Sequence, residues 1–326
     1  MARGDGADFN IPFEKRLLSI KNIKNLLKIR KILKAEGFDA IILNTNLAAF
    51  IIRLALPKRL KKTTKVINFV HGYLFSRRSR AFSSAFFLLC EMLVRQKCDT
   101  VITMNSEDYR TAIRYRLARG RVIASRGVGI RPMQNFLPPE KIRDEYFPSA
   151  RYVIAFVGEL SKRKNQVFLI KCLPRIRRVL GDVRLCLVGD GRERDRLLRL
   201  VRRLSLEDAV QLLGYREDAA DFIRACDLYV SPSLSEGMPL NVIEAMTLGK
   251  TALVSRIKGH RDLISDGVNG YLYDPFDMEE FTSLSCRILI SGGFDPAVVR
   301  DSASLYTRSG ALFEILSIFW DEIGGI

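Results

Sequence analysis

At 326 residues, 48% of them hydrophobic, the chain is long enough for two hydrophobic cores, and its apolar runs are far shorter than the ~20 residues that cross a bilayer. Six cysteines without a CxxC pair, only two histidines and the signal-free opening MARGDGADFN argue against a zinc site and secretion, and favour a cytoplasmic protein with reduced thiols. The net charge of +17 lies entirely in residues 1–150, which hold 29 Lys and Arg against 12 Asp and Glu, so this half is expected to face an anionic partner or to be a solvated basic surface.

Four apolar, β-branched runs of the first half predict parallel strands, at residues 38–44, 64–72, 99–105 and 121–129. Helical patterns lie between them, and the clearest helix, IKNIKNLLKIRKILKAEG, ends at Gly37 as its cap. A proline- and charge-rich stretch, residues 138–151, predicts a linker. We therefore place a first α/β domain at residues 1–145.

The second half alternates strands and helices with short loops, which predicts a doubly wound sheet of the Rossmann type at residues 146–290. The predicted strands are residues 152–158, 183–189, 209–214, 228–233 and 250–255, followed by a helix–strand pair in HRDLISDGVNGYLYDP. Residues 291–326 are expected to form a helical segment that packs back toward the first domain. The predicted fold class is α/β, with two Rossmann-like doubly wound domains of which the first is incomplete.

Glycines and cations follow the predicted strands of the second domain. The loop after the first strand, GELSKRKNQ, contains Gly158 and the basic cluster Lys162, Arg163 and Lys164; GDGRE and GYRED follow the next two strands. Ligands of doubly wound sheets bind at the carboxyl ends of the strands, where glycine permits close backbone approach and lysine supplies charge for phosphate. These loops therefore predict a site for a phosphate-bearing ligand.

The stretch SEGMPLNVIEA places two acids, Glu236 and Glu244, on either side of a predicted helix start. Pro239 suits the first turn of a helix over residues 239–248, and Gly249 suits the position after its end. The N-terminus of such a helix would favour a diphosphate. Glu244 could accept two hydrogen bonds from ribose hydroxyls, and Glu236 could address a second sugar. The alternative is that both acids are simply solvated.

The blocks VGELSKRKNQ, LVGDGRERDRL, EGMPLNVIEA and DGVNGYLYDPFD, in this order, resemble the retaining glycosyltransferases of family 4, which use nucleotide sugars and have the two-Rossmann GT-B architecture. In the first half, HG at residues 71–72, ITMNSEDY and GVGI are similar to the branch associated with bacterial exopolysaccharide and capsule synthesis. Family members usually have arginine where this chain has Glu159, so Lys162 or Arg163 would take over its role. The family's opening strand, loop, helix and second strand have no counterpart here, and we expect their absence to expose apolar sheet edges.

The resemblance implies roles for single residues. Glu236 would lie near the transferred sugar, and His71 would contact that sugar from the first domain, which makes these two the candidate catalytic residues. Lys164 would contact the donor diphosphate, Glu244 the ribose, and the segment 214–216 the nucleobase. The complete set of implied donor-binding residues is Gly158, Lys162, Arg163, Lys164, Gly189, Gly214, Tyr215, Arg216, Gly237, Met238, Pro239, Leu240 and Glu244.

We therefore expect an enzyme that transfers a sugar from a nucleoside diphosphate sugar, a UDP-sugar, to a glycan or polyprenyl-linked acceptor with retention, without a metal or other cofactor. Its place would be the inner face of the membrane, with the basic first half on the anionic surface. The alternative is a degenerate glycosyltransferase-like protein that binds the donor nucleotide or a partner without catalysing transfer. A nucleic-acid-binding module is not expected, because basic and aromatic residues do not alternate as in RNA-binding motifs.

Overall fold

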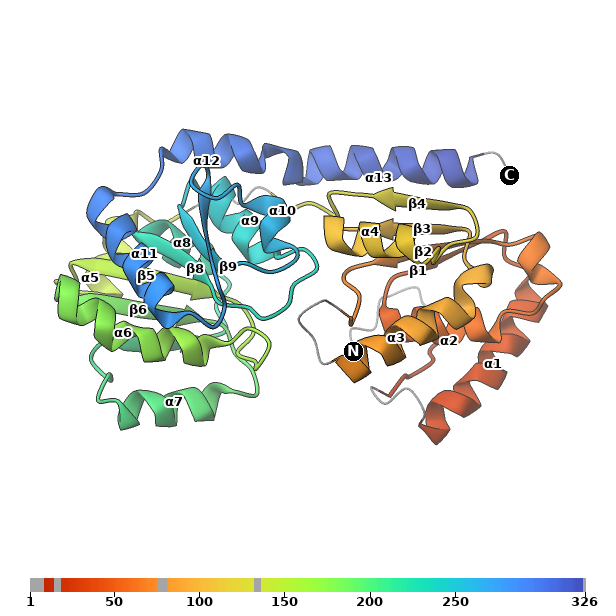
Figure 1. Cartoon of the computed structure of the whole chain (residues 1–326), viewed down its shortest axis with the longest axis horizontal. Helices are drawn as coiled ribbons and strands as arrows, with labels where there is room; N and C mark the ends of the chain where they lie inside the picture. Colours follow the sequence, from red (N-terminus) through yellow and green to blue (C-terminus); the bar gives the residue numbers. More distant parts are fainter. Residues whose placement is uncertain (1–8, 15–18, 76–80, 132–135, 325–326) are drawn as a thin grey trace. The chain divides into compact units, whose positions relative to one another are not determined.

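The structure is a computed structural model that describes residues 9–14, 19–75, 81–131 and 136–324. By its internal contacts the chain divides into two compact units (Figure 1): the first consists of Met1–Ser125 and Leu316–Ile326, the second of Arg126–Ile315. The predicted boundary at residue 145 differs from this division. The segment that we expected to be a linker contains helix α5 (Pro139–Tyr146), whose Ile142 is buried in the core of the second unit.

The first unit contains a four-stranded parallel sheet in the order β1-β2-β3-β4, which confirms the four predicted strands. The strands are β1 (Ala40–Leu43), β2 (Lys65–Val70), β3 (Thr100–Thr103) and β4 (Arg121–Ala124). The helices are α1 (Ile20–Glu36), α2 (Asn46–Ala55), α3 (Ala81–Val94) and α4 (Ser106–Arg114), with short 3-10 turns η1 (Leu60–Lys62) and η2 (Arg95–Lys97).

Local sequence explains the ends of α1. The Ser19 hydroxyl accepts a hydrogen bond from the Asn22 N–H at the first turn, and Gly37 adopts φ +59° at the other end, as predicted. Strand β1 is an edge strand of the described sheet, and Ile42 in it is 51% exposed.

Helix α13 (Arg308–Ile323) ends against the first sheet. The buried Glu322 carboxylate accepts a hydrogen bond from Thr100 Oγ1 at 2.6 Å and forms ion pairs with Lys65 Nζ at 3.0 Å and Arg121 Nη1 at 3.1 Å. These three partners begin strands β3, β2 and β4. The residues after 315 therefore belong to the first unit, although 190 residues of the second unit separate them from it in sequence.

The second unit contains a six-stranded parallel sheet in the order β10-β9-β8-β5-β6-β7, which confirms the predicted doubly wound domain. The strands are β5 (Tyr152–Val157), β6 (Val183–Val188), β7 (Val210–Gly214), β8 (Leu228–Ser231), β9 (Ala252–Ser255) and β10 (Gly270–Tyr273). The helices are α6 (Gln166–Leu180), α7 (Arg194–Arg203), α8 (Ala219–Ala225), α9 (Leu240–Thr247), α10 (His260–Leu263), α11 (Met278–Ser291) and α12 (Pro296–Ala303), and η3 (Ser304–Tyr306) precedes α13.

Helices cover both faces of this sheet and produce two apolar layers. One layer joins α6, α7 and α11 to the sheet, with the rings of Phe168, Tyr273 and Phe281 in mutual contact. The other joins α5, α8, α9 and α12, around Phe222 and Met246. Because both faces are covered, the carboxyl ends of the strands are left for ligand binding. Within the described ranges, no helix is long and apolar enough to span a membrane.

Candidate functional site

The strand order of the second sheet reverses at β5, which pairs with β6 on one side and β8 on the other. In doubly wound folds the ligand crevice lies at such a point, outside the carboxyl ends of the two strands. Here the loops after β5 and β8 are joined by hydrogen bonds. The Leu234 N–H donates to the Arg163 carbonyl at 2.8 Å, and Asn165 Nδ2 donates to the Pro232 carbonyl at 3.3 Å. The two loops thus form one surface.

Glu236 lies at the centre of this surface and holds two cations. Arg163 Nη1 donates to Glu236 Oε2 at 2.6 Å, and Lys164 Nζ is 2.8 Å from Oε1. Burial on its own would raise the pKa of Glu236, but the charges of Lys164 and Arg163 and hydrogen bonds from Lys164 and Ser233 hold it below its usual value. Two cations share one carboxylate, so the group has one excess positive charge, as a site for an anion requires.

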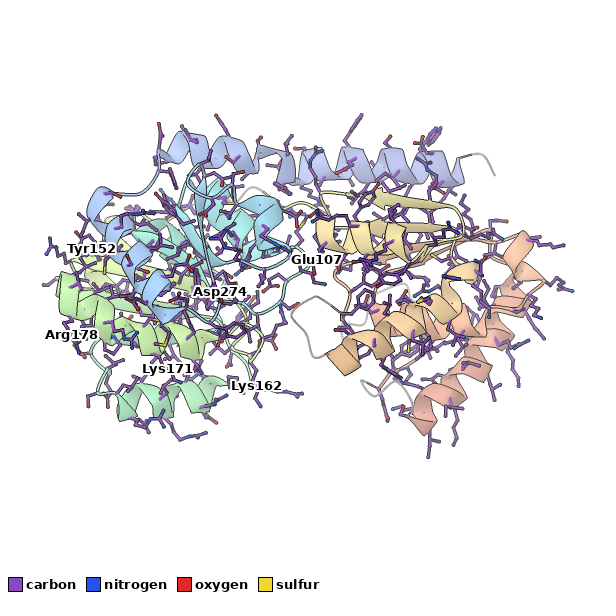
Figure 2. The ribbon with its side chains drawn as sticks, viewed as in Figure 1. Glu107, Tyr152, Lys162, Lys171, Arg178 and Asp274 are labelled. Atoms are coloured by element: carbon purple, nitrogen blue, oxygen red, sulfur yellow. The ribbon has the colours of Figure 1, made fainter. Side chains whose placement is uncertain are left out.

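The three members of the predicted basic cluster have different surroundings. Lys164 is buried, with 8% of its surface exposed, and contacts Glu236. Arg163 is half exposed and also donates to the Ser235 carbonyl at 2.9 Å. Lys162 is exposed, and its side chain lies at the margin of the second unit (Figure 2). Glu159 is exposed as well, and its carbonyl accepts a hydrogen bond from Gln166 Nε2 at 2.8 Å.

The predicted glycines meet where β5, β6 and β7 end. Gly189, with φ +131°, donates its N–H to the Gly214 carbonyl at 2.7 Å, and a Cβ at this position would collide with the Gly158 carbonyl. Only glycine fits such an approach of two backbones. Gly189 therefore lets the ends of β5 and β6 lie close together, whereas a Cβ at Gly214 would meet nothing within 4 Å.

In the segment 214–216, Arg216 and Tyr215 differ in how available their side chains are to a ligand. One guanidinium edge of Arg216 is held by Asp218: Nε donates to Oδ1 at 2.8 Å and Nη2 donates to Oδ2 at 2.6 Å, and the group lies over the rings of Tyr146 and Phe222. Asp218 raises the pKa of Arg216 further above its usual value. The ring of Tyr215 is 77% exposed. Tyr215 is thus the member of this segment with a free aromatic surface.

Helix α9 begins one residue later than predicted, because Pro239 caps the helix with ψ 88° and Leu240 is its first residue. Gly249 follows the end of the helix with φ +74°. Asn241 in the first turn was not among the predicted site residues. Its Nδ2 donates to the Val157 carbonyl at 2.8 Å and to Tyr229 Oη at 2.9 Å, which fixes the helix N-terminus to the ends of β5 and β8.

Glu244 lies in the second turn of α9 and is largely buried. Burial raises its pKa, and the charge of Lys164 opposes this effect without cancelling it. Of the predicted neighbours, Met238 packs on the second apolar layer and Leu240 is 39% exposed. In the second unit the structure thus brings Lys164 close to both acids, Glu236 by direct contact and Glu244 through its charge.

His260 is a second residue that the sequence did not reveal. It is fully buried at the start of α10; Nε2 is 3.2 Å from Ser231 Oγ, and Nδ1 is 2.8 Å from the Ser255 carbonyl, to which it donates. Burial lowers the pKa of His260 to about 4. A Cβ on the preceding residue, Gly259, would lie 2.7 Å from the Gly237 carbonyl. The start of α10 therefore packs directly against the loop of Glu236.

The predicted catalytic histidine, His71, belongs to the first unit, whereas Lys164, Glu236 and Glu244 belong to the second. It follows β2, and its Nε2 lies 2.6 Å from Asn44 Oδ1, at the end of β1. Partial burial lowers the pKa of His71, so the ring is neutral near pH 7. Over the part of the chain that the structure describes, no group of three or more His, Cys, Asp or Glu residues is arranged to hold a metal ion.

Comparisons with known proteins agree with this geometry. Residues 139–292 match the family model of glycosyl transferases group 1. The chain is 25% identical to the putative glycosyltransferase EpsD of Bacillus subtilis, over 84% of this chain and 73% of EpsD. It is 26% identical to the UDP-Gal:alpha-D-GlcNAc-diphosphoundecaprenol alpha-1,3-galactosyltransferase of Escherichia coli, over 82% of this chain and 71% of that enzyme.

Among solved structures, the chain is similar to Alr3699/HepE of Anabaena in complex with UDP and glucose. The TM-score is 0.72 at 20% identity, and the match covers 94% of this chain and 84% of HepE. The likeness confirms the predicted GT-B fold with Rossmann-like units.

Proposed function

We propose that the chain transfers a sugar from a UDP-sugar to a glycan or polyprenyl-linked acceptor with retention of the anomeric configuration, a proposal supported by the match of residues 139–292 to the family model of glycosyl transferases group 1. The observation that carries the proposal is the buried contact of Lys164 with Glu236, at the point where the strand order reverses. A site for the diphosphate of a nucleotide sugar needs excess positive charge in this position, and Arg163 and Lys164 supply it.

The reaction breaks the bond between the anomeric carbon and the donor diphosphate and forms a bond to an acceptor oxygen, whose proton is released. Negative charge grows on the leaving diphosphate as the first bond breaks. Lys164 and the N-terminus of α9, fixed by Asn241, are placed to stabilise that charge, and the proposal includes no metal ion or other cofactor.

The other residues of the proposed site bind different parts of the donor. Glu244, once ionised, accepts hydrogen bonds from the ribose hydroxyls, and the exposed ring of Tyr215 offers a stacking surface to the base. In this proposal Glu236 and the backbone of Gly237 bind the transferred sugar, and His71 has the catalytic role that the resemblance implies. The uridine nucleotide is supported by the similarity to HepE, which was solved with UDP.

For the acceptor, we extend the proposal to surface polysaccharide synthesis at an anionic membrane surface. The Escherichia coli relative is named for an acceptor with a diphosphoundecaprenol carrier. The first half of the chain carries the whole charge excess, which suits both an anionic carrier and an anionic leaflet. In this proposal the basic half attaches the protein peripherally to the membrane.

The test compares Lys164→Ala with Lys171→Ala in calorimetric titrations with UDP. Removal of the buried cation should weaken UDP binding by about tenfold to a hundredfold, whereas Lys171, exposed on α6 and without a role in the proposed site, serves as a matched control with little effect. Equal affinities of both variants and the original chain would show that the assigned donor site is wrong. If the original chain binds UDP but neither hydrolyses UDP-sugars nor transfers sugar to lipid-linked acceptors, the non-catalytic alternative is correct.

A further inference from the structure

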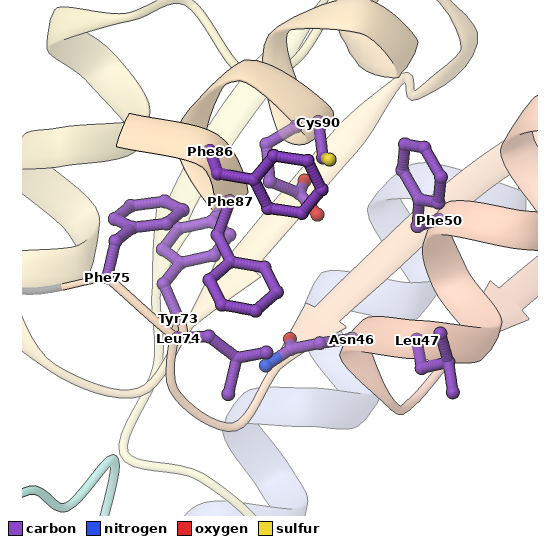
Figure 3. A pocket seen from close by; sticks show the side chains of 10 residues that line it. Asn46, Leu47, Phe50, Tyr73, Leu74, Phe75, Phe86, Phe87 and Cys90 are labelled. Carbon is purple, nitrogen blue, oxygen red and sulfur yellow. The ribbon is translucent and has the colours of Figure 1, made fainter. Parts of the chain in front are cut away.

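The first unit contains an apolar pocket of about 380 Å³, a volume within the range of small-molecule sites. Figure 3 shows the rings of Tyr73, Phe75, Phe86 and Phe87 on one side of it and Phe50 on the other. Tyr73 and Phe75 are stacked with ring centroids 4.6 Å apart. The pocket is therefore walled mainly by aromatic faces from α2, α3 and the loop after β2.

Glu91 lines the pocket, but its carboxylate does not make the pocket polar. Both oxygens of Glu91 accept hydrogen bonds from Arg53 Nη2, each at 2.9 Å, and Arg53 is fully buried, with its Nε donating to the Ala49 carbonyl. The carboxylate is thus compensated from inside the protein. A ligand that enters the pocket must be uncharged and apolar where it contacts these walls.

The pocket lies next to the loop of the candidate catalytic histidine. Asn46, which lines the pocket, donates its Nδ2 to the Gly72 carbonyl at 2.8 Å, and Gly72 lies between His71 and the pocket residue Tyr73. His71 itself contacts Asn44, two residues before Asn46. The loops after β1 and β2 therefore hold His71 and one wall of the pocket together. A ligand could place its polar end near His71 and an apolar extension among the rings.

We propose that this pocket binds the apolar chain of an isoprenoid diphosphate that carries the acceptor glycan. The inference rests on the proposed function and adds the part of the acceptor that is recognised. Residues 1–150, with 29 cationic and 12 acidic residues, can attract the diphosphate, while the neutral pocket binds the isoprenoid chain. The Escherichia coli relative is named for an acceptor with such a carrier.

The direct test measures binding of farnesyl diphosphate and of inorganic diphosphate to the full chain by calorimetry. We expect farnesyl diphosphate to bind about tenfold more tightly or better, because the pocket buries its apolar chain. Phe86→Ser should remove this preference. Leu93→Ser is the matched control, since Leu93 lies on the same helix, is 69% exposed and does not line the pocket. Equal affinities of the two ligands for the original chain would overturn the proposal, and so would an equal loss of the preference in both variants, which would indicate adsorption to the apolar helix surface.

A second measurement needs no variant that alters the pocket wall. Cys90 lines the pocket and is half-buried, whereas the other five cysteines are buried. Farnesyl diphosphate should slow the alkylation of Cys90 by N-ethylmaleimide about tenfold, and inorganic diphosphate should not, with Cys90→Ser marking the background. Alkylation at the same rate with either ligand would contradict the proposal.

Binding of UDP separates this inference from the proposed function. Phe86→Ser should keep the UDP affinity of the original chain, because the assigned donor residues lie in the second unit. An unchanged fluorescence of Trp320, which belongs to the first unit, checks that the unit carrying the substitution is folded. Loss of farnesyl selectivity with intact UDP binding supports the pocket assignment. A chain that binds UDP and lacks farnesyl selectivity from the start disproves the pocket alone, whereas absent UDP binding disproves the donor site.

Discussion

Glu236 and Glu244 are eight residues apart and both largely buried, yet their pKa values move in opposite directions. Glu236 stays ionised because it contacts two cations, whereas Glu244 has only the more distant influence of Lys164 and its pKa rises. The difference gives the two acids different tasks. Glu236 balances the charges of Arg163 and Lys164, and Glu244, which forms no ion pair with another residue that the structure describes, suits hydroxyl groups.

Glu244→Gln should remove the preference of the site for ribose over deoxyribose. In the original chain UDP should bind about tenfold more tightly than 2′-deoxy-UDP, because the ionised carboxylate accepts a hydrogen bond from the 2′-hydroxyl. In the variant the two ligands should bind almost equally. Titration calorimetry with both ligands measures the difference, and a preference that survives the substitution would mean that another group reads the ribose.

The preference of the original chain for UDP over 2′-deoxy-UDP should also depend on pH, and Glu244→Gln serves for comparison. The raised pKa of Glu244 means that acidification protonates this carboxyl at a pH above the ordinary carboxylate range, and UDP affinity should fall with it. Because UDP itself titrates, the readout is the ratio of the two affinities, which should approach one as pH decreases. A ratio that stays constant as the pH falls from 8 to about 4, below the ordinary carboxyl pKa, would contradict the assignment.

The buried imidazole of His260 should make the second unit sensitive to acid. Its pKa in the folded chain is about 4, below the ordinary value, so below about pH 6.5 the unfolded chain binds a proton that the folded chain does not. The stability that this produces is complete at neutral pH and is lost as pH falls toward 4, by about 2 kcal/mol between pH 7 and pH 5.

His260→Gln should reduce that loss in urea unfolding followed by circular dichroism. His71→Gln is the matched control, because it removes the other histidine of the chain and leaves the buried one. The prediction concerns the slope of stability against pH, not the absolute stability of either variant. Identical slopes in all three proteins would show that His260 does not titrate as described.

At the scale of elements, the strands were predictable to within a few residues because buried parallel strands are continuous apolar runs. The linker prediction at residues 138–151 was wrong because three prolines and many charges concealed an amphipathic helix. Pro139 begins α5 at a position that needs no N–H donor, and Ile142 and Phe147 are buried. Charged residues on the exposed face of a short helix look like a linker when only composition is considered.

The residues of the candidate site could also be predicted only in part from the sequence. Lys164 and Glu236 could be found because both follow predicted strands, and parallel strands end at a common edge. Asn241 and His260 could not, because their functions depend on partners 84 and 29 residues away, Val157 and Ser231. Their short polar side chains form no spacing pattern. The ends of predicted strands thus locate a site, whereas the residues that hold the site in its conformation can be identified only once the packing of the folded chain is known.

Gly189→Ala should strongly destabilise the second unit. The added methyl group would collide with the Gly158 carbonyl, and φ +131° is itself unfavourable for alanine, so we expect a loss of about 3 kcal/mol or more. Gly267→Ala is the control: φ is also positive, +76°, but the new Cβ meets nothing within 4 Å, and about 1 kcal/mol is expected. Thermal unfolding compares the two, and equal losses would mean that strain rather than the close approach of β5 and β6 is decisive.

At the scale of the molecule, the first unit combines residues from both ends of the sequence. Glu322 is the clearest link, because one buried carboxylate joins the starts of β2, β3 and β4. Burial opposes ionisation of Glu322, but Thr100, Lys65 and Arg121 lower its pKa below the usual value. The sequence predicts a helical C-terminal segment, but it does not identify the partners of Glu322, which lie more than 200 residues away.

Glu322→Ala should lower the stability of the first unit by about 2 kcal/mol, because Thr100 loses its acceptor and two cations lose their counter-charge. Asp321→Asn, at the neighbouring exposed position, is the control and should have little effect. Trp320 is the only tryptophan of the chain and lies on the same helix, so its fluorescence follows urea unfolding at this place. Equal midpoints for the original chain and Glu322→Ala would show that the carboxylate contributes nothing to stability.

The division of the first unit also has a consequence for synthesis. On the ribosome, Lys65, Thr100 and Arg121 are made long before Glu322, and the contiguous second unit, Arg126–Ile315, is completed in between. Domains generally fold as units while the chain grows. The second unit can therefore fold first, while the first sheet keeps three strand ends without the Glu322 carboxylate until α13 is translated. A nascent chain arrested before residue 316 should thus protect the second unit, and not the first, from protease.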